Sequence, residues 1–149
     1  MLDRLYKTQE CSAARALEIV GERWSLLILR DAIFRRYTRF TDFQRSLGIA
    51  TNILAKRLEG FVQAGLMTEN AAAGASGHRE YYLTEKGRGL TPAIVALTEW
   101  GDAWVGTGPV SFRHDDCGGR VRLELHCGCC DEPVSVEQVK AAKRDEPAT

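Results

Sequence analysis

The chain has 149 residues, 44% of them hydrophobic, and its 20 Lys and Arg residues balance 20 Asp and Glu residues, so the formal net charge is zero. This length predicts one domain of ordinary size with room for a short appendage. No run of about 18 apolar residues is present, which argues against a membrane span, and residues 1–10 lack the features of a signal peptide. We therefore expect a cytoplasmic protein whose five cysteines are free thiols or metal ligands rather than disulfides.

The zero net charge conceals an uneven distribution along the chain. Residues 1–60 contain 11 Lys and Arg against 7 Asp and Glu, whereas residues 61–105 contain 3 against 5 and residues 106–149 contain 6 against 8. A basic N-terminal part is what phosphate binding requires. The excess is modest, so a functional prediction also needs motifs.

The first part of the chain is predicted to be helical. Residues 11–21 have apolar side chains at helical spacing, and residues 24–34 (WSLLILRDAIF) are apolar on nearly all sides, which is typical of a central helix. A short basic loop, RRYTR at residues 35–39, follows them.

A short amphipathic helix is predicted to begin at Thr41 and to stop at Gly48. Thr41 and Gln44 have the spacing of a capping box, in which each side chain satisfies a free backbone N–H of the first turn. Its apolar face consists of three residues at helical spacing: Phe40, Phe43 and Leu47.

A second helix is predicted from about residue 50 to residue 63, with Gly65 as its C-terminal stop. One side of this helix is apolar. The opposite side is polar and is formed by Asn52, Lys56, Glu59 and Gln63, with Thr51 and Ala55 at its edge. Two short helices joined by a tight turn that contains glycine are typical of a helix-turn-helix.

Two strands and a further helix complete the predicted domain. The strands are residues 66–70 and 79–83, with a loop of small residues between them. Thr84 caps the next helix, which Pro92 interrupts or restarts. The order of helix, helix, helix-turn-helix, strand, loop, strand and helix predicts a winged helix, an α+β fold that is mainly α.

Several segments, taken in order, resemble the HxlR family of bacterial transcriptional regulators, a branch of the MarR-like winged helices. They are Cys11 at the start of the first helix, GERW at 21–24, RFTDFQRSLGI at 39–49, LAKRLEGFVQAGLM at 54–67, YYLTEKGRGL at 81–90 and Trp100-Gly101. The resemblance implies a homodimer, built largely from the first and last helices, that binds pseudo-palindromic operator DNA and has no catalytic site. Two features depart from the family. Ala50 stands where the family usually has Ser, so that Thr51 is left as the candidate cap, and the wing is less basic and lacks proline.

The polar face of the second helix supplies the candidate readers of base edges, because Asn pairs with adenine and Lys with guanine in the major groove. These residues are Thr51, Asn52, Ala55 and Lys56. Arg35, Arg36 and Arg39 are candidate phosphate contacts, and His78 and Arg79 of the wing are candidates for the minor groove. For all of these residues the alternative is a side chain that is merely solvated. Arg57 lies nearer the buried flank of the second helix, where a structural salt bridge and a phosphate contact are equal alternatives.

Cys11 is a candidate redox sensor, since some members of the resembled family use a thiol at this place. A helix N-terminus stabilises a thiolate and so raises its reactivity. The alternative is a small buried core residue. No second cysteine precedes residue 117, so the sequence excludes a disulfide within the winged helix.

The chemistry changes in the C-terminal appendage, residues 106–149, which we separate from the winged-helix domain at 1–105. His114-x2-Cys117 and Cys127-x2-Cys130 flank a predicted VRLEL strand at 121–125, and a helical tail is expected from residue 136 to residue 143. Two ligand pairs of this kind predict one structural zinc site. The nine residues between the pairs are fewer than usual, Cys129 or His126 could replace a ligand, and free thiols are the alternative.

These features together predict a dimeric DNA-binding transcriptional regulator, a repressor whose signal is unknown, with a thiol-reactive compound as one candidate. Its partners would be double-stranded DNA and a second copy of the chain, with no membrane. The alternative is a winged-helix module for protein–protein contact that does not bind DNA. An enzyme is not expected, because four protein ligands leave no open position on a zinc ion for water.

Overall fold

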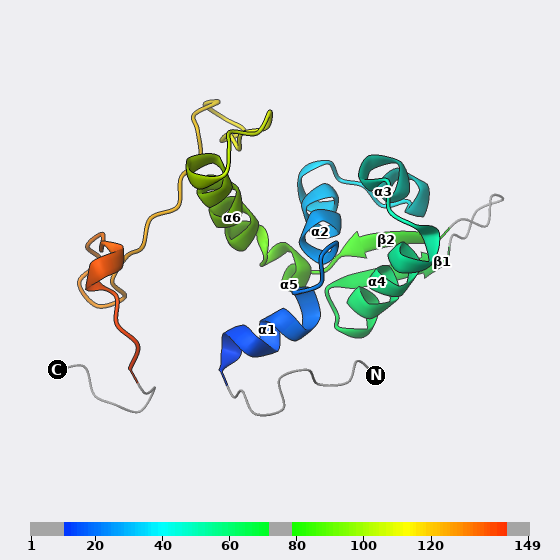
Figure 1. Ribbon diagram of the computed structural model, residues 1–149, viewed down its shortest axis with the longest axis horizontal. Helices are drawn as coiled ribbons and strands as arrows, with labels where there is room; N and C mark the ends of the chain where they lie inside the picture. Colours follow the sequence, from blue (N-terminus) through cyan, green and yellow to red (C-terminus); the bar gives the residue numbers. More distant parts are fainter. Residues whose placement is uncertain (1–10, 72–78, 143–149) are drawn as a thin grey trace. The chain divides into compact units, whose positions relative to one another are not determined.

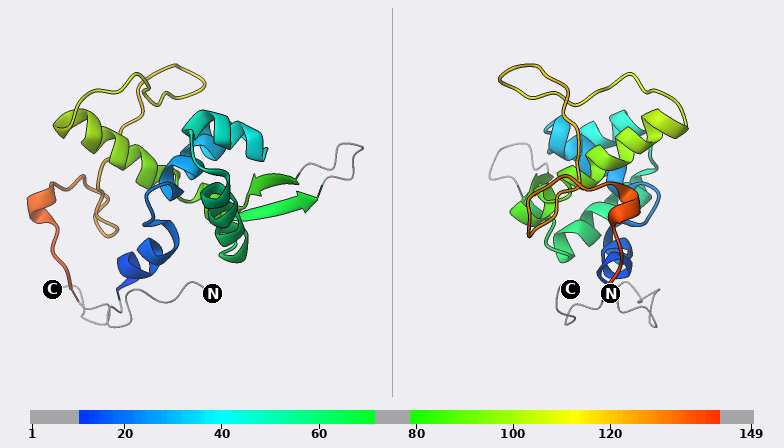
Figure 2. Two further views of the ribbon diagram at one scale, coloured as in Figure 1. Left: turned by 45° about the vertical axis from the view of Figure 1, so that its right-hand side comes forward. Right: turned by 90° about the vertical axis from the view of Figure 1, so that its left-hand side faces the viewer.

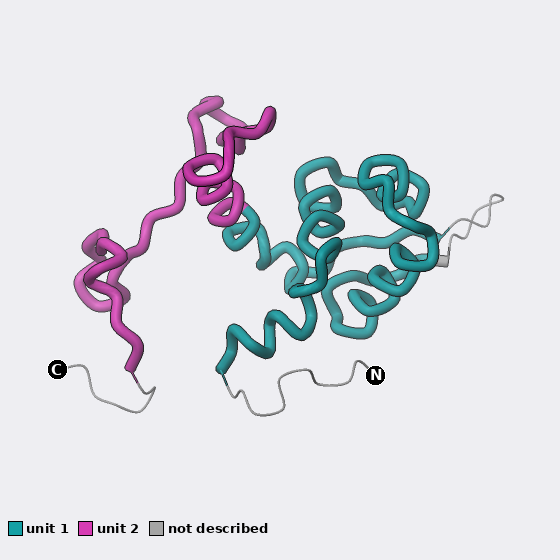
Figure 3. Tube along the Cα trace, in the orientation of Figure 1, with its two compact units in different colours: residues 1–94 teal, residues 95–149 magenta. Residues whose placement is uncertain are grey.

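A computed structural model describes residues 11–71 and 79–142 of the chain. The chain divides into two compact units, residues 1–94 and residues 95–149 (Figure 3). This division falls within the last long helix, α6, whereas the predicted domain boundary after residue 105 directly follows that helix. Among the described helices, none combines the length and apolar character needed to cross a membrane.

The elements follow the predicted order (Figure 1). They are α1 (Ser12–Val20), α2 (Ser25–Phe34), α3 (Phe40–Leu47), α4 (Thr51–Gln63), β1 (Met67–Ala71), β2 (Arg79–Leu83), α5 (Glu85–Arg88) and α6 (Thr91–Trp104). The core of the first unit lies around α2, which packs on α1, α3 and β2, while α4 packs on α3 and β1. Its fully buried apolar side chains include Ile28, Leu29, Phe43, Leu54 and Leu58. Burying a side chain of this size stabilises the fold by about 1.5–3 kcal/mol.

Glycines with positive φ end both helices of the predicted helix-turn-helix. Gly48 follows α3 with φ 61°, and Gly65 lies just past α4 with φ 72°. The amide of Leu66 donates to Phe61 O at 2.8 Å and that of Gly65 donates to Val62 O at 3.0 Å. This pair of bonds is a Schellman motif, which satisfies carbonyls that the helix end leaves free.

The predicted helix starts were wrong in their capping. α3 begins at Phe40, one residue early, and Arg39 occupies the N-cap position without a side-chain bond. The capping box from Thr41 does not form there, because pairing with β2 holds the extended backbone of Arg39 and so sets the start of the helix. Thr51 is the first residue of α4 and not its cap; Ala50 is the N-cap and has no side-chain bond to give.

β1 and β2 form an antiparallel hairpin whose register runs from Met67↔Leu83 to Ala71↔Arg79. Figure 2 shows the two strands projecting away from the helices. The chain before α3 adds one rung to this sheet, since the amide of Tyr81 donates to Thr38 O at 2.7 Å. The arrangement confirms the predicted winged helix-turn-helix.

The connection from the hairpin to α6 also follows the prediction. Thr84 Oγ1 caps α5 by accepting from the Gly87 amide at 3.1 Å. Pro92 lies in the first turn of α6, where its missing N–H costs no helix hydrogen bond, so it restarts the helix rather than breaking it.

The C-terminal secondary structure was predicted incorrectly. Residues 121–125 form no strand in this structure: the Leu123 amide donates to the side chain of Glu99 at 3.3 Å rather than to a neighbouring strand. Single bridges join Arg113 to Arg120 and His126 to Pro133 instead. The helical tail is reduced to one 3₁₀ turn, Val136–Gln138. In the described residues beyond 105 no side chain is buried.

Candidate functional site

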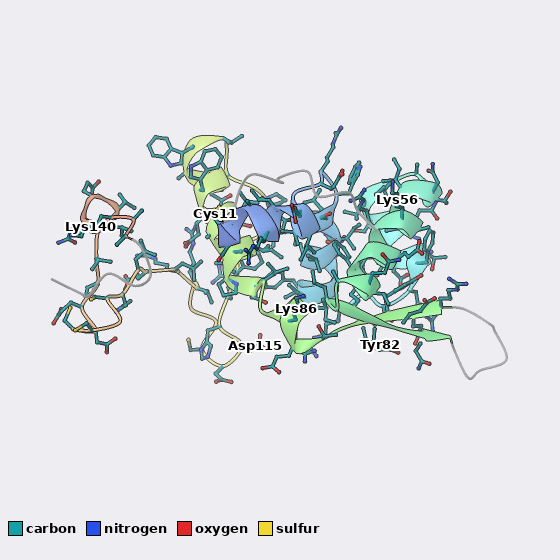
Figure 4. The ribbon with its side chains drawn as sticks, turned by 90° about the horizontal axis from the view of Figure 1, so that it is seen from below. Cys11, Lys56, Tyr82, Lys86, Asp115 and Lys140 are labelled. Atoms are coloured by element: carbon teal, nitrogen blue, oxygen red, sulfur yellow. The ribbon has the colours of Figure 1, made fainter. Side chains whose placement is uncertain are left out.

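The outer face of α4 presents the predicted base-reading residues to solvent. Thr51, Asn52, Ala55 and Lys56 are all exposed, while Leu54 and Leu58 on the opposite face are fully buried. Figure 4 labels Lys56 on this helix. Within the described part of the chain, the side chains of Asn52 and Lys56 have no hydrogen-bond or salt-bridge partner. Two polar side chains one helical turn apart are therefore available to a ligand.

Arg57 lies on the flank of α4 and has a structural role. Its side chain is only 13% exposed, and its Nη2 lies 3.6 Å from Glu22 Oε1 in the connection between α1 and α2. Of the two alternatives open from the sequence, the structure supports the salt bridge.

The loop after α2 holds Arg35 in a defined position. Its Nη1 donates to Ser46 Oγ of α3 at 3.2 Å, and its Nε lies 3.7 Å from Asp31 Oδ1. The guanidinium also lies over the Tyr37 ring, 5.9 Å from the centroid. A hydrogen bond with Tyr37, followed by the charge of Asp31, raises the pKa of Arg35. The cation is thus fixed beside the start of the helix-turn-helix.

Asp31 is the residue behind this arrangement that the sequence analysis missed. It is fully buried, accepts from Ser46 Oγ at 2.6 Å and from Arg30 Nε at 2.9 Å, and so joins α2 to α3. A buried carboxylate is tolerated only when it is paired and hydrogen-bonded. The available signal was a single acid within an otherwise apolar helix, with Arg30 beside it and Arg35 four residues on.

Arg39 is held by the wing rather than left free. Its Nε lies 3.2 Å from Glu80 Oε1, and the two residues form an isolated backbone bridge. The Tyr82 hydroxyl donates to the other oxygen of Glu80. This hydrogen bond and then the one from Arg39 lower the pKa of Glu80, while the Glu80 carboxylate raises the pKa of Tyr82. A phosphate would compete with Glu80 for Arg39.

The remaining predicted phosphate and groove contacts differ in how far they are engaged. Arg36 is exposed, has a positive φ of 55°, and forms no ion pair with any residue that the structure describes. Arg79 is 70% exposed but pairs with Glu69 of β1 at 3.1 Å. His78 lies outside the described residues. Among the described arginines of the predicted set, Arg36 is therefore the most available.

Cys11 is the N-cap of α1. Its Sγ accepts from the amide of Ala14 at 3.3 Å, and the residue is exposed. This arrangement contradicts the alternative of a buried packing residue. The Cys11 sulfur therefore lies at an exposed helix N-terminus, where a reagent in solvent can reach it.

The C-terminal ligand candidates lie in two turns. His114 Nδ1 and Cys117 Sγ are 3.3 Å apart in the first turn, near Asp115 in Figure 4. Cys127 and Cys130 share the second turn, where backbone hydrogen bonds from Cys130 and then Cys129 lower the pKa of the Cys127 thiol. Across the described ranges, no three of these residue types converge on one point, so the two turns do not share a site in this structure.

Known proteins resemble this chain over most of its length. The HxlR-like helix-turn-helix model matches residues 19–108. The uncharacterised HTH-type transcriptional regulator Rv3095 of Mycobacterium tuberculosis is 41% identical over 86% of this chain and 82% of its own. The crystal structure of PA1607, a candidate transcription factor, superposes with a TM-score of 0.83 at 40% identity and covers 93% of this chain and 98% of its own. The redox regulator HypR in its oxidised form is 26% identical, with a TM-score of 0.57, over 62% of this chain and 96% of its own.

The family match spans more than half of the chain, and it agrees with the helix-turn-helix geometry described above. It also agrees with the expectation that the protein is not an enzyme, since the family consists of regulators. The chain belongs to the HxlR-like helix-turn-helix family and is a transcriptional regulator of the helix-turn-helix type.

Proposed function

We propose that the protein is a dimeric repressor that inserts α4 into the major groove of a pseudo-palindromic operator. The observation that carries this proposal is the outer face of α4, where Asn52 and Lys56 are exposed and have no partner among the described side chains. An unengaged amide and an unengaged ammonium one turn apart match the hydrogen-bonding edges of adenine and guanine. The proposal places the protein in the cytoplasm with the DNA.

Phosphate contacts would come from the loop between α2 and α3. Arg35 is positioned by Asp31 and Ser46, and Arg36 is exposed beside it. Such contacts fix the register of the protein on the duplex and provide most of the salt-dependent affinity, without reading the sequence. The acidic wing, in which Glu69 and Glu80 neutralise Arg79 and Arg39, would add less.

Dimerisation is supported by the apolar face of α6. Leu97, Trp100 and Trp104 recur at helical spacing and are 53%, 57% and 78% exposed. Tryptophan is enriched at protein interfaces and costly to leave in water. A second copy of the chain is the occupant that a two-fold symmetric operator requires. Leu2, Leu5 and Tyr6, which we also expect at this interface, lie outside the described residues.

Sedimentation equilibrium tests the dimer. At micromolar concentration the mass should be twice that of one chain, and Trp100→Glu should shift it toward the monomer. Val139→Glu, at a residue equally exposed but outside α6, is the control and should leave the dimer intact. A monomer mass for the unaltered chain would overturn this part of the proposal.

We propose that Cys11 receives the signal. Its exposure and N-cap position support this role, and the redox regulator HypR is among the structural neighbours. An oxidant or electrophile that modifies Cys11 should release DNA, and Cys11→Ser should remain bound under the same treatment. Cys129→Ser, which removes another exposed thiol, is the matched control and should still respond. If Cys11→Ser also responds, the signal acts elsewhere.

Selection from random DNA followed by binding titrations tests the central proposal. Asn52→Ala should lose discrimination at one position of each half-site, at a cost of about 1–3 kcal/mol for the preferred base. Arg36→Ala should weaken binding to every sequence. It should also reduce the slope of log affinity against log salt concentration by about 0.9, the contribution of one phosphate contact. Arg122→Ala, an exposed arginine outside the winged helix, is the control.

The outcome also decides between the two functions considered. If no sequence is enriched and any interaction is independent of salt, the winged helix does not bind DNA, and the protein–protein module is the better interpretation.

A further inference from the structure

The C-terminal segment contains the same backbone turn twice. In the first turn, residues 113–120, the amide of Gly118 donates to His114 O at 2.8 Å and that of His114 donates to Gly119 O at 2.9 Å. In the second turn, residues 126–133, the corresponding bonds are from Asp131 to Cys127 O at 2.9 Å and from Cys127 to Glu132 O at 3.0 Å. One isolated bridge closes each turn.

The two turns also match in the position of their left-handed residue and in the placement of their ligand-type residues. The fifth residue after the bridge has positive φ in both, 68° at Gly118 and 57° at Asp131. Counted from the bridge residue that opens each turn, a His or Cys comes first and a Cys comes fourth: His114 and Cys117, then Cys127 and Cys130. Sequence spacing alone gave the pairs, whereas the repeated backbone geometry is a property of the structure.

We propose that the two turns come together on one structural zinc ion per chain, held by His114, Cys117, Cys127 and Cys130. On binding, the three thiols lose their protons to solvent and become thiolates, and the imidazole binds in its neutral form. Three sulfurs and one nitrogen complete the tetrahedral shell of a structural zinc site.

Each turn already has the local features of half a site. In the first, Nδ1 of His114 lies 3.3 Å from Cys117 Sγ, and Nε2 lies 3.6 Å from Asp116 Oδ2. A carboxylate near the second ring nitrogen is the usual companion of a metal-bound histidine. In the second turn, the bond from the Asp131 amide to Cys127 O at 2.9 Å keeps Cys127 and Cys130 within one turn of the backbone.

The other two candidate ligands are less suited. Both histidines have a carboxylate 3.6 Å from Nε2, but Nδ1 of His126 lies 3.2 Å from the backbone oxygen of Asp131, whereas Nδ1 of His114 lies beside a thiol. Cys129 is the third residue after the bridge residue of its turn, and the corresponding residue of the first turn is Asp116, which is outside the proposed ligand set.

The chain between the turns can join them. Nine residues separate Cys117 from Cys127, and extended they span about 30 Å at most. In a tetrahedral site with Zn–S bonds of about 2.3 Å, two sulfurs lie about 4 Å apart, so this segment must reverse direction. Residues 121–125 take part in no helix or strand, so their reversal would break no ladder of hydrogen bonds; it would break the bond from the Leu123 amide to Glu99 Oε2.

A metal would also give this segment a source of order that it otherwise lacks. None of the described residues from 106 to 142 is buried, and a polar segment of this size cannot order itself through an apolar core. The free energy of zinc binding would take the place of the missing core.

The test uses the full chain purified without added metal or chelator. Elemental analysis should find about one zinc ion per chain. Replacement by Co²⁺ should give the visible absorption of a tetrahedral site and a thiolate-to-cobalt charge-transfer band. Cys117→Ser, Cys127→Ser and Cys130→Ser should each lose most of the metal, whereas Cys129→Ser and Cys11→Ser should retain it. Native-state hydrogen exchange should show that chelation loosens residues 113–133 and spares α2 to α4.

Three results would overturn the proposal. The first is a chain that contains no zinc and takes up neither zinc nor cobalt on titration. The second is undiminished metal in Cys117→Ser or Cys127→Ser. The third is recovery of zinc when the Cys117→Ser and Cys127→Ser proteins are mixed, because that would place the site between two chains rather than within one.

Discussion

The winged-helix unit and the C-terminal turns are specified by different physical means. In the first unit the chain buries Phe43, Leu54 and Leu58 completely, and the ends of α3 are set by strand pairing and by Gly48. In residues 106–142 no described side chain is buried, and the turns rest on local backbone hydrogen bonds. A hydrophobic core determines a fold without help, whereas local turns of this kind need an additional source of free energy such as a metal.

The largest test of this difference is a truncation of one large apolar side chain in each region. Phe43 is fully buried and meets the Tyr37 ring edge-on, with centroids 6.2 Å apart. Phe43→Ala should lower the free energy of unfolding by about 3–5 kcal/mol, because it leaves a cavity. Leu125 is 52% exposed, and Leu125→Ala should change the free energy of unfolding by about 0.5 kcal/mol or less. Urea denaturation measures both; equal losses would mean that the C-terminal segment has a core of its own.

A second test compares the fully buried carboxylate of Asp31 with that of Asp102, which is 17% exposed and pairs with an exposed arginine. Asp31 is fully buried against Arg30 and Ser46, and Asp31→Asn should cost about 2–3 kcal/mol, since hydrogen bonds to a charged group are lost. Asp102 lies 3.8 Å from Arg120, whose side chain is 53% exposed, and Asp102→Asn should cost about 1 kcal/mol or less because solvent screens the pair. Thermal denaturation of the two variants gives the comparison. A small loss for Asp31→Asn would show that packing alone joins α2 to α3.

The same contrast explains what could be predicted from sequence. The order of elements, both glycine stops and the cap at Thr84 were predictable because each depends on neighbouring residues. The true start of α3 was not predictable, and the expected cap at Thr41 is absent. That start is fixed by the pairing of Arg39 with Glu80, 41 residues further along the chain. The prediction of a strand at 121–125 was wrong for a related reason. Alternation of apolar and polar residues shows that a segment can pair in a sheet, but not that it has a partner.

The candidate site was predictable in its outline and not in its ionic partners. Helical spacing was enough to place Asn52 and Lys56 on the exposed face of α4. It gave no indication that Glu80 holds Arg39 or that Glu69 holds Arg79, because those pairs join residues that come together only in the folded wing. Whether any of these residues contacts DNA stays a prediction.

A third and smaller test uses two glycines with nearly the same backbone conformation. Gly65 and Gly118 have φ of 72° and 68°. At either position an alanine methyl group would meet none of the described residues within 4 Å, its chain neighbours apart, so the expected cost of alanine is backbone strain. Gly65→Ala should lower the free energy of unfolding of the winged helix by about 1 kcal/mol, because it strains the Schellman motif. Gly118→Ala should leave that transition unchanged and loosen only residues 113–120 in hydrogen exchange. A shared loss in both regions would show that the two unfold together.

The smallest expected effect concerns function rather than folding, and it separates cations that the fold uses from those it leaves free. Glu80→Gln removes the carboxylate that holds Arg39 while keeping the shape of the side chain. If Arg39 then turns to a phosphate, DNA affinity should rise several-fold at low salt, and the logarithmic salt dependence should steepen by about 0.9. In an Arg39→Ala background the same substitution should have little effect, since a double-mutant cycle isolates the pair.

The pH dependence of that substitution gives an independent check. The hydrogen bond from Tyr82 and then that from Arg39 lower the pKa of Glu80, so the carboxylate remains ionised below the usual range for glutamate. A depressed pKa means that the pair contributes above the unfolded pKa and is lost only as pH falls through the folded one. The gain from Glu80→Gln should therefore be equal at about pH 6 and about pH 8. A gain that shrinks between those values would mean that Glu80 titrates there, and that Tyr82 and Arg39 do not hold it as the geometry indicates.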